Sequence, residues 1–450
     1  MRKLHVMGLA AAIAIVAAVF FFLKISAPRP SDKPNLILIS LDTLRADRLG
    51  TYKYSRATSP FLDSWASGAA VFEHAVTAAP WTLPSHVSIF TGLYPTSHGV
   101  NEAKKRSIGE STELFTEILQ RNGYQNFAYV AGGYVGKRYG FARGFDSFIY
   151  NSGERSNKAR GFPRTVTMAL EKLEKRDPSK PFFLFLHTYA VHCPYTAPEP
   201  YRDMFNSPDA EPIDTSRCDR FNGKEGFTKG HAQFLSDRYD GSVRFVDDTL
   251  KTLFEGLEKQ GVKDNTFIII TSDHGESFLE HGRIGHSESL YKELLMVPLI
   301  VSGPGIKPQR ISEAVNLVDI FPTVLDLLGF PASTQPDGHT LAALLHGQQE
   351  SFSRPPYQLS ELHRGKMLRS LIDPVDEHFI LDLETNTAQL FKLPVDPLET
   401  KDLATSMPDR ISEWRSILDR LSKGLHERPT GKMDPATKEQ IEQLKTLGYL

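Results

Sequence analysis

Cysteine and net charge are both scarce in this sequence of 450 residues. There are two cysteines, Cys193 and Cys218, so a disulfide framework is excluded and a single bond between them is left open. The 52 Lys and Arg residues nearly balance the 54 Asp and Glu residues, and the formal charge is −2. Because there is neither a basic excess nor a dense basic patch interleaved with aromatics, we expect no nucleic-acid partner. The length suits one large α/β domain and a smaller one.

A long uncharged run lies at the N-terminus. Val6 to Leu23 are 18 residues without a charge, just enough to span a bilayer as a helix. The run is long for a cleaved signal, and no clear A-x-A site follows it, so residues 1–24 are predicted to be a signal anchor in preference to a signal peptide. Residues 25–34 are then a Pro-rich linker. We expect an exported protein held at the membrane, periplasmic if bacterial.

Continuous apolar runs alternate with helical patterns between residues 35 and 350. The predicted buried strands are PNLILISLD, NFAYVA, PFFLFLHTY, TFIIITSDHGE and VPLIVSGPG. The predicted helices include one from Pro60 after an N-cap at Ser59, one from Pro84 closed by Gly92, and a long amphipathic one through Val243 and Leu257. This alternation predicts an α/β fold whose mostly parallel central sheet is covered on both faces.

The pattern changes after about residue 350. HRGKMLRSLID, EHFILDLETN and AQLFKLP predict short antiparallel strands joined by turns. We therefore expect a main domain at 35–350, followed by a small antiparallel subdomain with a polar helical tail at 351–450.

Ligand-type side chains follow two of the predicted strands. Asp42 ends the first strand, and Asp273 and His274 follow the isoleucine run. In parallel sheets the functional site lies beyond the carboxyl ends of the strands. Two carboxylates and one imidazole, with Thr82 as a further oxygen ligand, suit one divalent cation. Taken singly, each residue also has a simpler interpretation, because Asp and Thr often cap helices and turns.

Several histidines are candidates for contact with an anionic substrate. His187 and His192 flank the end of the PFFLFLHTY strand, and His281 and His286 lie in the segment after His274. Imidazoles near a cation suit an anionic tetrahedral group, either as charge partners or as proton donors to a leaving group. A lone histidine is more often structural than catalytic, so only a cluster of them would support this role.

Together these stretches resemble the sulfatase family, within the alkaline-phosphatase-like superfamily. The resemblance runs in family order from about residue 35 to 405 and is carried by NLILISLDTLRADRLGTY, SPFLDSWASGAAVFEHAV, WTLPSHVSIFTGLYPTSHGV, GFARGFDSF, FLHTYAVHCPY, SDHGESFLEHGRIGHSESLYKELLMVPLIVSGPG, LVDIFPTVLDLLG and DPLETKDLA. It implies a three-layer α/β sandwich with a small C-terminal four-stranded sheet, and a divalent metal beside the nucleophile.

The resemblance also implies roles for individual residues. Asp42, Asp273 and His274 match the family's metal ligands, and Thr82 matches the nucleophile beside the metal. His192 and His286 match substrate-binding or leaving-group positions, and we expect both to be catalytic. His86, in place of the motif's Arg, and Lys137, near where the family often has a basic residue, would bind substrate.

The sequence departs from the family pattern at its nucleophile. Sulfatases use C/S-x-P-x-R, whose Cys or Ser is oxidised to formylglycine, whereas this chain has Thr82-Leu83-Pro84-Ser85-His86. Oxidation of Thr would give a ketone instead of the aldehyde. Thr43 also stands where a second Asp is common. A Thr nucleophile resembles the phosphoryl-transferring branch: nucleotide pyrophosphatases, phosphoethanolamine transferases and lipoteichoic-acid synthases.

We therefore expect a metal-dependent hydrolase or phosphotransferase that acts on an anionic phosphoester through Thr82. A sulfatase that works without formylglycine and a catalytically inactive, membrane-tethered binding protein are the alternatives. A His ligand favours Mn²⁺ or Zn²⁺, with Ca²⁺ or Mg²⁺ as further candidates.

Overall fold

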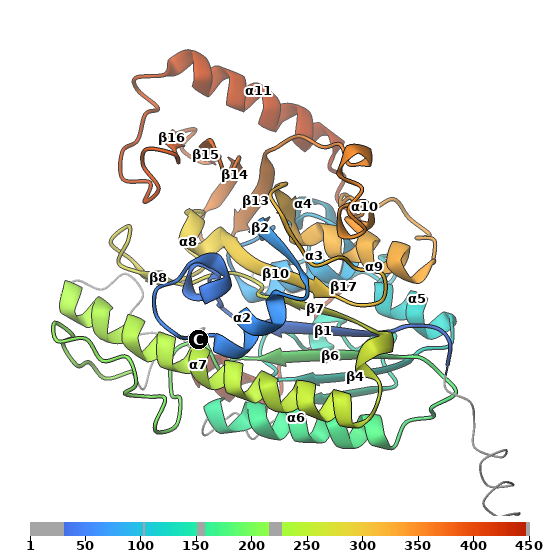
Figure 1. The fold of residues 1–450 in the computed structure, drawn as a ribbon. Helices are drawn as coiled ribbons and strands as arrows, with labels where there is room; N and C mark the ends of the chain where they lie inside the picture. Colours follow the sequence, from blue (N-terminus) through green and yellow to red (C-terminus); the bar gives the residue numbers. More distant parts are fainter. Residues whose placement is uncertain (1–30, 102–103, 151–157, 216–226, 447–450) are drawn as a thin grey trace, which may run out of the picture.

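A computed structural model describes residues 31–101, 104–150, 158–215 and 227–446 (Figure 1). The predicted anchor at residues 6–23 and Cys218 lie outside these ranges, so the membrane anchor and the disulfide stay predictions. Among the described helices, none combines the length and the apolar composition needed to cross a bilayer.

Nine strands of the described ranges form the central sheet, in the order β11-β2-β10-β7-β1-β6-β4-β5, with β12 paired to β2. Neighbours are parallel throughout, except that β10 runs antiparallel to both β7 and β2. The sheet is thus mostly parallel, as predicted. Its strands are β1 (Asn35–Leu41), β2 (Ala70–Val76), β4 (Gln125–Val130), β5 (Ser147–Tyr150), β6 (Phe182–Thr188), β7 (Thr266–Thr271), β10 (Met296–Ser302), β11 (Gln309–Ile311) and β12 (Val315–Asn316).

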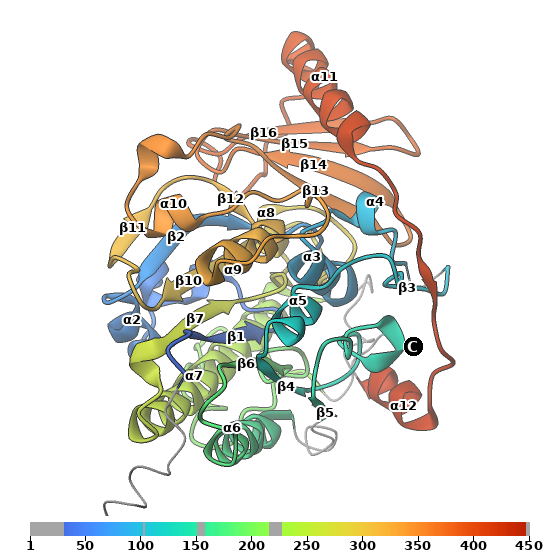
Figure 2. The ribbon, with the colours of Figure 1, turned by 90° about the vertical axis from the view of Figure 1, so that its right-hand side faces the viewer.

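Both faces of the sheet are apolar, because its central strands are continuous apolar runs and successive side chains point to opposite faces. On β1, Leu36 and Leu38 join a core with α3 (Thr82–Thr91), α5 (Phe115–Arg121) and α9 (Ile320–Leu328). Ile37 and Ile39 join the opposite core, with α2 (Pro60–Ala66), α6 (Lys158–Glu174) and α7 (Lys229–Lys259). Figure 2 shows these two helical layers on either side of the sheet, which is the expected three-layer sandwich.

The C-terminal part forms a second, antiparallel sheet in the order β13-β14-β15-β16. Its strands are Gln358–His363, Met367–Ile372, Glu377–Asp382 and Ala388–Lys392. Helix α11 (Pro408–Gly424) covers it with Trp414 and Leu418, which pack on Phe379 (Figure 2). The strand β13 joins this sheet to the main domain, because Glu361 N donates to Ala78 O (2.9 Å) and Ser360 Oγ donates to Thr77 O (2.6 Å).

Short elements complete the described fold. They are the helices α4 (Pro95–His98), α8 (Lys292–Leu295), α10 (Ala342–Leu345) and α12 (Lys438–Thr446), the 3-10 helices η1 (Ala46–Arg48), η2 (Gly50–Tyr52), η3 (Lys137–Tyr139), η6 (Lys263–Asn265), η7 (Leu317–Asp319) and η8 (Gln349–Ser351), and the strand pairs β3 (Arg106–Ser107) with β17 (Gly431–Lys432) and β8 (Ser277–Phe278) with β9 (Ile284–Gly285).

Candidate active site and metal centre

The first two ligand candidates meet because their strands are neighbours in register. Strands β1 and β7 run parallel with Ser40 opposite Thr271, so Asp42 and Asp273 each stand two residues past a paired position. One ligand atom from each of Asp42, Asp273 and His274 lies within 4.8 Å of the others, and all three residues are buried. Among the described residues, Asp42, Asp273 and His274 form the one group of three side chains close enough to share a metal ion.

The Asp273 carboxylate is fixed at one oxygen. Its Oδ1 accepts hydrogen bonds from the backbone N–H of Thr43 (3.2 Å) and of His274 (3.0 Å). Thr43 has φ 62°, a left-handed conformation that is costly for a β-branched residue and that turns this N–H toward Asp273. Asp273 Oδ2 receives no hydrogen bond from the described residues, although it is fully buried. A buried carboxylate oxygen in that position fits a bound cation.

The protonation states suit a metal. Burial by itself would raise the pKa of Asp273, but the nearby imidazoles of His274, His86 and His187 hold it at about 2. Burial lowers the pKa of His274 to about 4, and the neighbouring His286 adds to this shift. At neutral pH the carboxylate is therefore charged and the imidazole neutral, which is the form in which both bind metals. The donor set of two carboxylates and one imidazole thus fits a divalent cation.

Thr82 is the first residue of α3, two residues earlier than the predicted start at Pro84. Its Oγ1 lies 3.4 Å from Asp42 Oδ2 and 3.4 Å from His274 Nε2. The N-cap position belongs to Trp81, which makes no side-chain cap bond. The alternative interpretation of Thr82 as the cap of this helix is therefore wrong. Gly92 ends the helix with φ 69°, as predicted.

Two buried histidines lie behind this group. His86 Nδ1 donates to Thr82 O at 2.9 Å, and its Nε2 is 2.9 Å from Ser40 Oγ. Both ring nitrogens are thus bonded within the protein and the residue is fully buried, which favours a positioning role over the predicted contact with substrate. His187 Nε2 lies 3.2 Å from Asp42 Oδ2, and its pKa is well below the usual range because of burial.

His187 was singled out in the sequence only as a flanking residue. The structure brings its ring to Asp42 because β6 is the parallel neighbour of β1 and His187 pairs with Ser40. Adjacent buried strands that both end in polar residues bring those residues to one edge of the sheet.

His192 and His286 come together in front of the metal ligands. The ring centroid of His286 is 4.4 Å from that of His274 and 5.1 Å from that of His192. His192 Nδ1 donates to Cys193 O at 2.7 Å. The other two candidates lie elsewhere: Lys137 is exposed on η3, and its side chain makes no hydrogen bond or ion pair with the described residues, while His281 Nδ1 pairs with Glu293 (2.9 Å).

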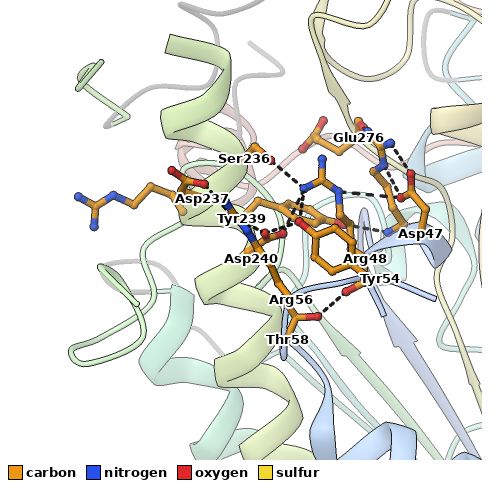
Figure 3. A network of polar contacts seen from close by, with 12 residues as sticks. Asp47, Arg48, Tyr54, Arg56, Thr58, Ser236, Asp237, Tyr239, Asp240 and Glu276 are labelled. Carbon is orange, nitrogen blue, oxygen red and sulfur yellow. Dashed lines mark hydrogen bonds and ion pairs between the residues drawn. The ribbon is translucent and has the colours of Figure 1, made fainter. Parts of the chain in front are cut away.

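A polar network holds the segment after Asp42 against α7 (Figure 3). Arg48 Nη1 and Arg56 Nη1 reach the buried carboxylate of Asp240 at 3.2 and 2.8 Å, and Tyr54 OH donates to it at 2.5 Å. Arg45 continues the network to Glu280 and, through Nη1, to the backbone oxygen of Glu276 (2.9 Å). The network ties the segments that follow β1 and β7 to one helix.

The second sheet also reaches the site. Arg364, in the turn between β13 and β14, places its guanidinium 4.9 Å from the ring centroid of Trp81, the residue before Thr82. This cation–π contact puts a permanent positive charge beside the start of α3.

A family model described as Sulfatase matches residues 34–330. The chain belongs to the sulfatase family. Among the relatives of this sulfatase-family protein, arylsulfatase K of Gallus gallus is 26% identical over 457 residues, covering 87% of this chain and 84% of the relative. N-acetylglucosamine-6-sulfatase of Capra hircus is 28% identical over 372 residues, with coverages of 71% and 65%.

Two solved structures share the fold of this chain. The phosphonate monoester hydrolase of Agrobacterium radiobacter superimposes with a TM-score of 0.73 at 20% identity, covering 90% of this chain and 100% of that one. A 2-O GAG sulfatase superimposes with a TM-score of 0.72 at 21% identity, covering 90% and 96%. These likenesses support the α/β architecture. The match to the family model, over residues 34–330, is what identifies this chain as a sulfatase-family hydrolase.

Proposed function

We propose that this protein is a metal-dependent hydrolase or phosphotransferase that cleaves anionic phosphoesters through Thr82. The observation that carries the proposal is the position of Thr82 Oγ1, 3.4 Å from both Asp42 Oδ2 and His274 Nε2. Thr cannot yield the formylglycine aldehyde, so a direct attack by the hydroxyl is the chemistry open to this side chain. Phosphoryl groups suit an alcohol nucleophile that forms a covalent intermediate.

Asp42, Asp273 and His274 would hold the divalent cation, with Mn²⁺ or Zn²⁺ favoured by the imidazole. When bound, such a cation lowers the pKa of a neighbouring hydroxyl and offsets the negative charge of the transferred group. The N-terminus of the ten-residue helix α3, whose first residue is Thr82, adds a favourable potential for that charge. Arg364 would contribute a permanent positive charge for an anionic substrate.

The chain's own residues account for the proton transfers. As Thr82 Oγ1 forms a bond to phosphorus, its proton passes to the carboxylate of Asp42, whose Oδ2 lies 3.4 Å away. The bond from phosphorus to the leaving oxygen breaks, its electron pair stays on that oxygen, and His192 or His286 supplies the proton. Water then attacks the phosphothreonine and gives a proton to the histidine that protonated the leaving group. The bond from phosphorus to Thr82 Oγ1 breaks, and Oγ1 takes back its proton from Asp42. In a transferase an acceptor alcohol replaces this water.

The experiment compares p-nitrophenyl phosphate, bis(p-nitrophenyl) phosphate, a p-nitrophenyl phosphonate and p-nitrophenyl sulfate, with each metal added in turn. We expect turnover of one of the phosphorus esters, and a phosphoryl group on the peptide containing Thr82 after acid quenching. Turnover of the sulfate alone would contradict the proposal. It would support the second candidate, a sulfatase acting without formylglycine, which the relatives named arylsulfatase favour.

We also propose that the protein works outside the cytoplasm, anchored by residues 6–23. The uncharged run supports this. Fractionation of a tagged protein tests it: recovery with membranes is expected, and recovery in the soluble cytosol would contradict it.

A further inference from the structure

One buried carboxylate next to the site has no part in the chemistry derived so far. Glu276 is fully buried, two residues after His274. Its Oε1 lies 2.8 Å from His286 Nδ1, and its Oε2 accepts a hydrogen bond from Tyr195 OH at 3.0 Å. Its backbone oxygen accepts a hydrogen bond from Arg45 Nη1 at 2.9 Å. Both carboxylate oxygens and the main chain are therefore fixed by different segments.

The close packing of Gly275, the residue before Glu276, also fixes the position of the backbone here. A Cβ on Gly275 would lie 1.9 Å from Glu293 O, so only glycine lets the chain pass here. Gly275 N also donates to Leu294 O at 2.9 Å. The backbone that carries His274 and Glu276 is thus pinned against the residues just before β10.

We propose that Glu276 is a positioning residue that sets the tautomer and the orientation of His286. The inference rests on the proposed function, because it takes His286 to be the leaving-group acid. A carboxylate can only accept a hydrogen bond, so His286 Nδ1 must donate and carries a proton. The atom that exchanges a proton with substrate is then Nε2, on a ring whose centroid is 4.4 Å from that of His274.

The proton balance follows from that arrangement. Nε2 of the imidazolium gives its proton to the leaving oxygen as the bond from this oxygen to the transferred group breaks. The neutral imidazole that remains keeps its proton on Nδ1, against Glu276. When water attacks the Thr82 adduct, Nε2 takes a proton from this water and the imidazolium is restored. His192 Nδ1 donates instead to a backbone oxygen, that of Cys193, at 2.7 Å. Glu276 therefore distinguishes the two histidines.

The test uses Glu276→Gln, with Glu293→Gln as the matched control. Glu293 is also a buried Glu, bonded to Nδ1 of a histidine of the same segment, His281, at 2.9 Å. For phenyl esters, whose leaving group needs a proton, we expect Glu276→Gln to lower kcat by ~10- to 100-fold with KM changed less than about 3-fold. For 2,4-dinitrophenyl esters, whose leaving group needs none, kcat should change less than about 3-fold. Glu293→Gln should leave both series unchanged.

Two further variants make the result decisive. Tyr195→Phe removes the hydroxyl that fixes Glu276 Oε2, and should produce a smaller loss with the same dependence on leaving group. In a His286→Ala background, Glu276→Gln should have no additional effect on kcat. An equal loss on both ester series, or a further loss in the His286→Ala background, would show a merely structural role and overturn the inference.

The test of Glu276 can succeed or fail independently of the test of the proposed function. If the wild type hydrolyses sulfate esters and no phosphorus ester, the proposed function fails, yet the same comparison of phenyl and dinitrophenyl esters can be run on the sulfate series. A leaving-group dependence there would still support the role of Glu276.

Discussion

Replacement of Thr82 distinguishes a catalytic role from a structural one, because the two roles predict very different losses in kcat/KM and in the free energy of unfolding. Thr82→Val keeps the shape of the side chain and removes only the hydroxyl. The contacts of Oγ1 with Asp42 Oδ2 and with His274 Nε2 are both 3.4 Å, which is long for a hydrogen bond, so their loss should change the free energy of unfolding by no more than ~1 kcal/mol. Loss of a covalent nucleophile should lower kcat/KM by ~1,000-fold or more, which corresponds to ~4 kcal/mol of transition-state stabilisation.

Thr91→Val is the control for this measurement. Thr91 is also a buried threonine of α3, whose Oγ1 donates to Val87 O at 2.7 Å, but it lies at the opposite end of the helix from the metal ligands. Urea unfolding should show no larger destabilisation for Thr82→Val than for Thr91→Val, and only Thr82→Val should lose turnover. Thr82→Ser, which keeps the hydroxyl, should retain part of the activity.

The assay is steady-state kinetics on the ester that the wild type cleaves fastest, with protein verified as folded. Retention of more than a tenth of wild-type kcat/KM by Thr82→Val, a difference under ~1.4 kcal/mol, would refute the covalent role. An equal loss in Thr91→Val would show that the effect comes from the helix and not from the hydroxyl.

The metal ligands and their loop give three further predictions. Asp273→Ala should remove the metal and abolish turnover, and full metal content by elemental analysis would contradict the assignment. Because burial lowers the pKa of His274 to about 4, protons should compete with the metal only as the pH approaches that value, and metal loss on dialysis near pH 6.5 would contradict this. Gly275→Ala should lower the free energy of unfolding by ~1–3 kcal/mol, because its Cβ would lie 1.9 Å from Glu293 O, and an unchanged Tm would contradict this.

Much of the fold followed from local patterns. The buried runs at β1, β6 and β7 are strands, and the amphipathic run through Val243 and Leu257 is the long helix α7. Periodicity does not report strand direction, which is why the antiparallel pairing of β10 could not be foreseen. The strands β2 and β13 were also missed. They carry polar side chains such as Glu73 and Glu361, which find partners in distant segments, Arg310 and Thr96.

Part of the candidate site was also predicted from local patterns. Asp42, Asp273 and His274 could be picked out because each follows a buried strand, and the structure places their ligand atoms together. The burial of His86 and the exposure of Lys137 could not be predicted from the sequence. The direction of each side chain depends on how its segment packs in the tertiary structure.

By itself the sequence determined the layered α/β architecture, the residue types at the strand ends and the replacement of the formylglycine precursor by Thr82. Those features depend on local hydrophobic pattern and on residue identity. The tertiary structure alone decided that His187 meets Asp42 and that Glu276 meets His286, across 145 and 10 residues of chain. Such pairings depend on strand register and on the path of the loop after β7. Both are set by packing between distant segments, which no local pattern encodes.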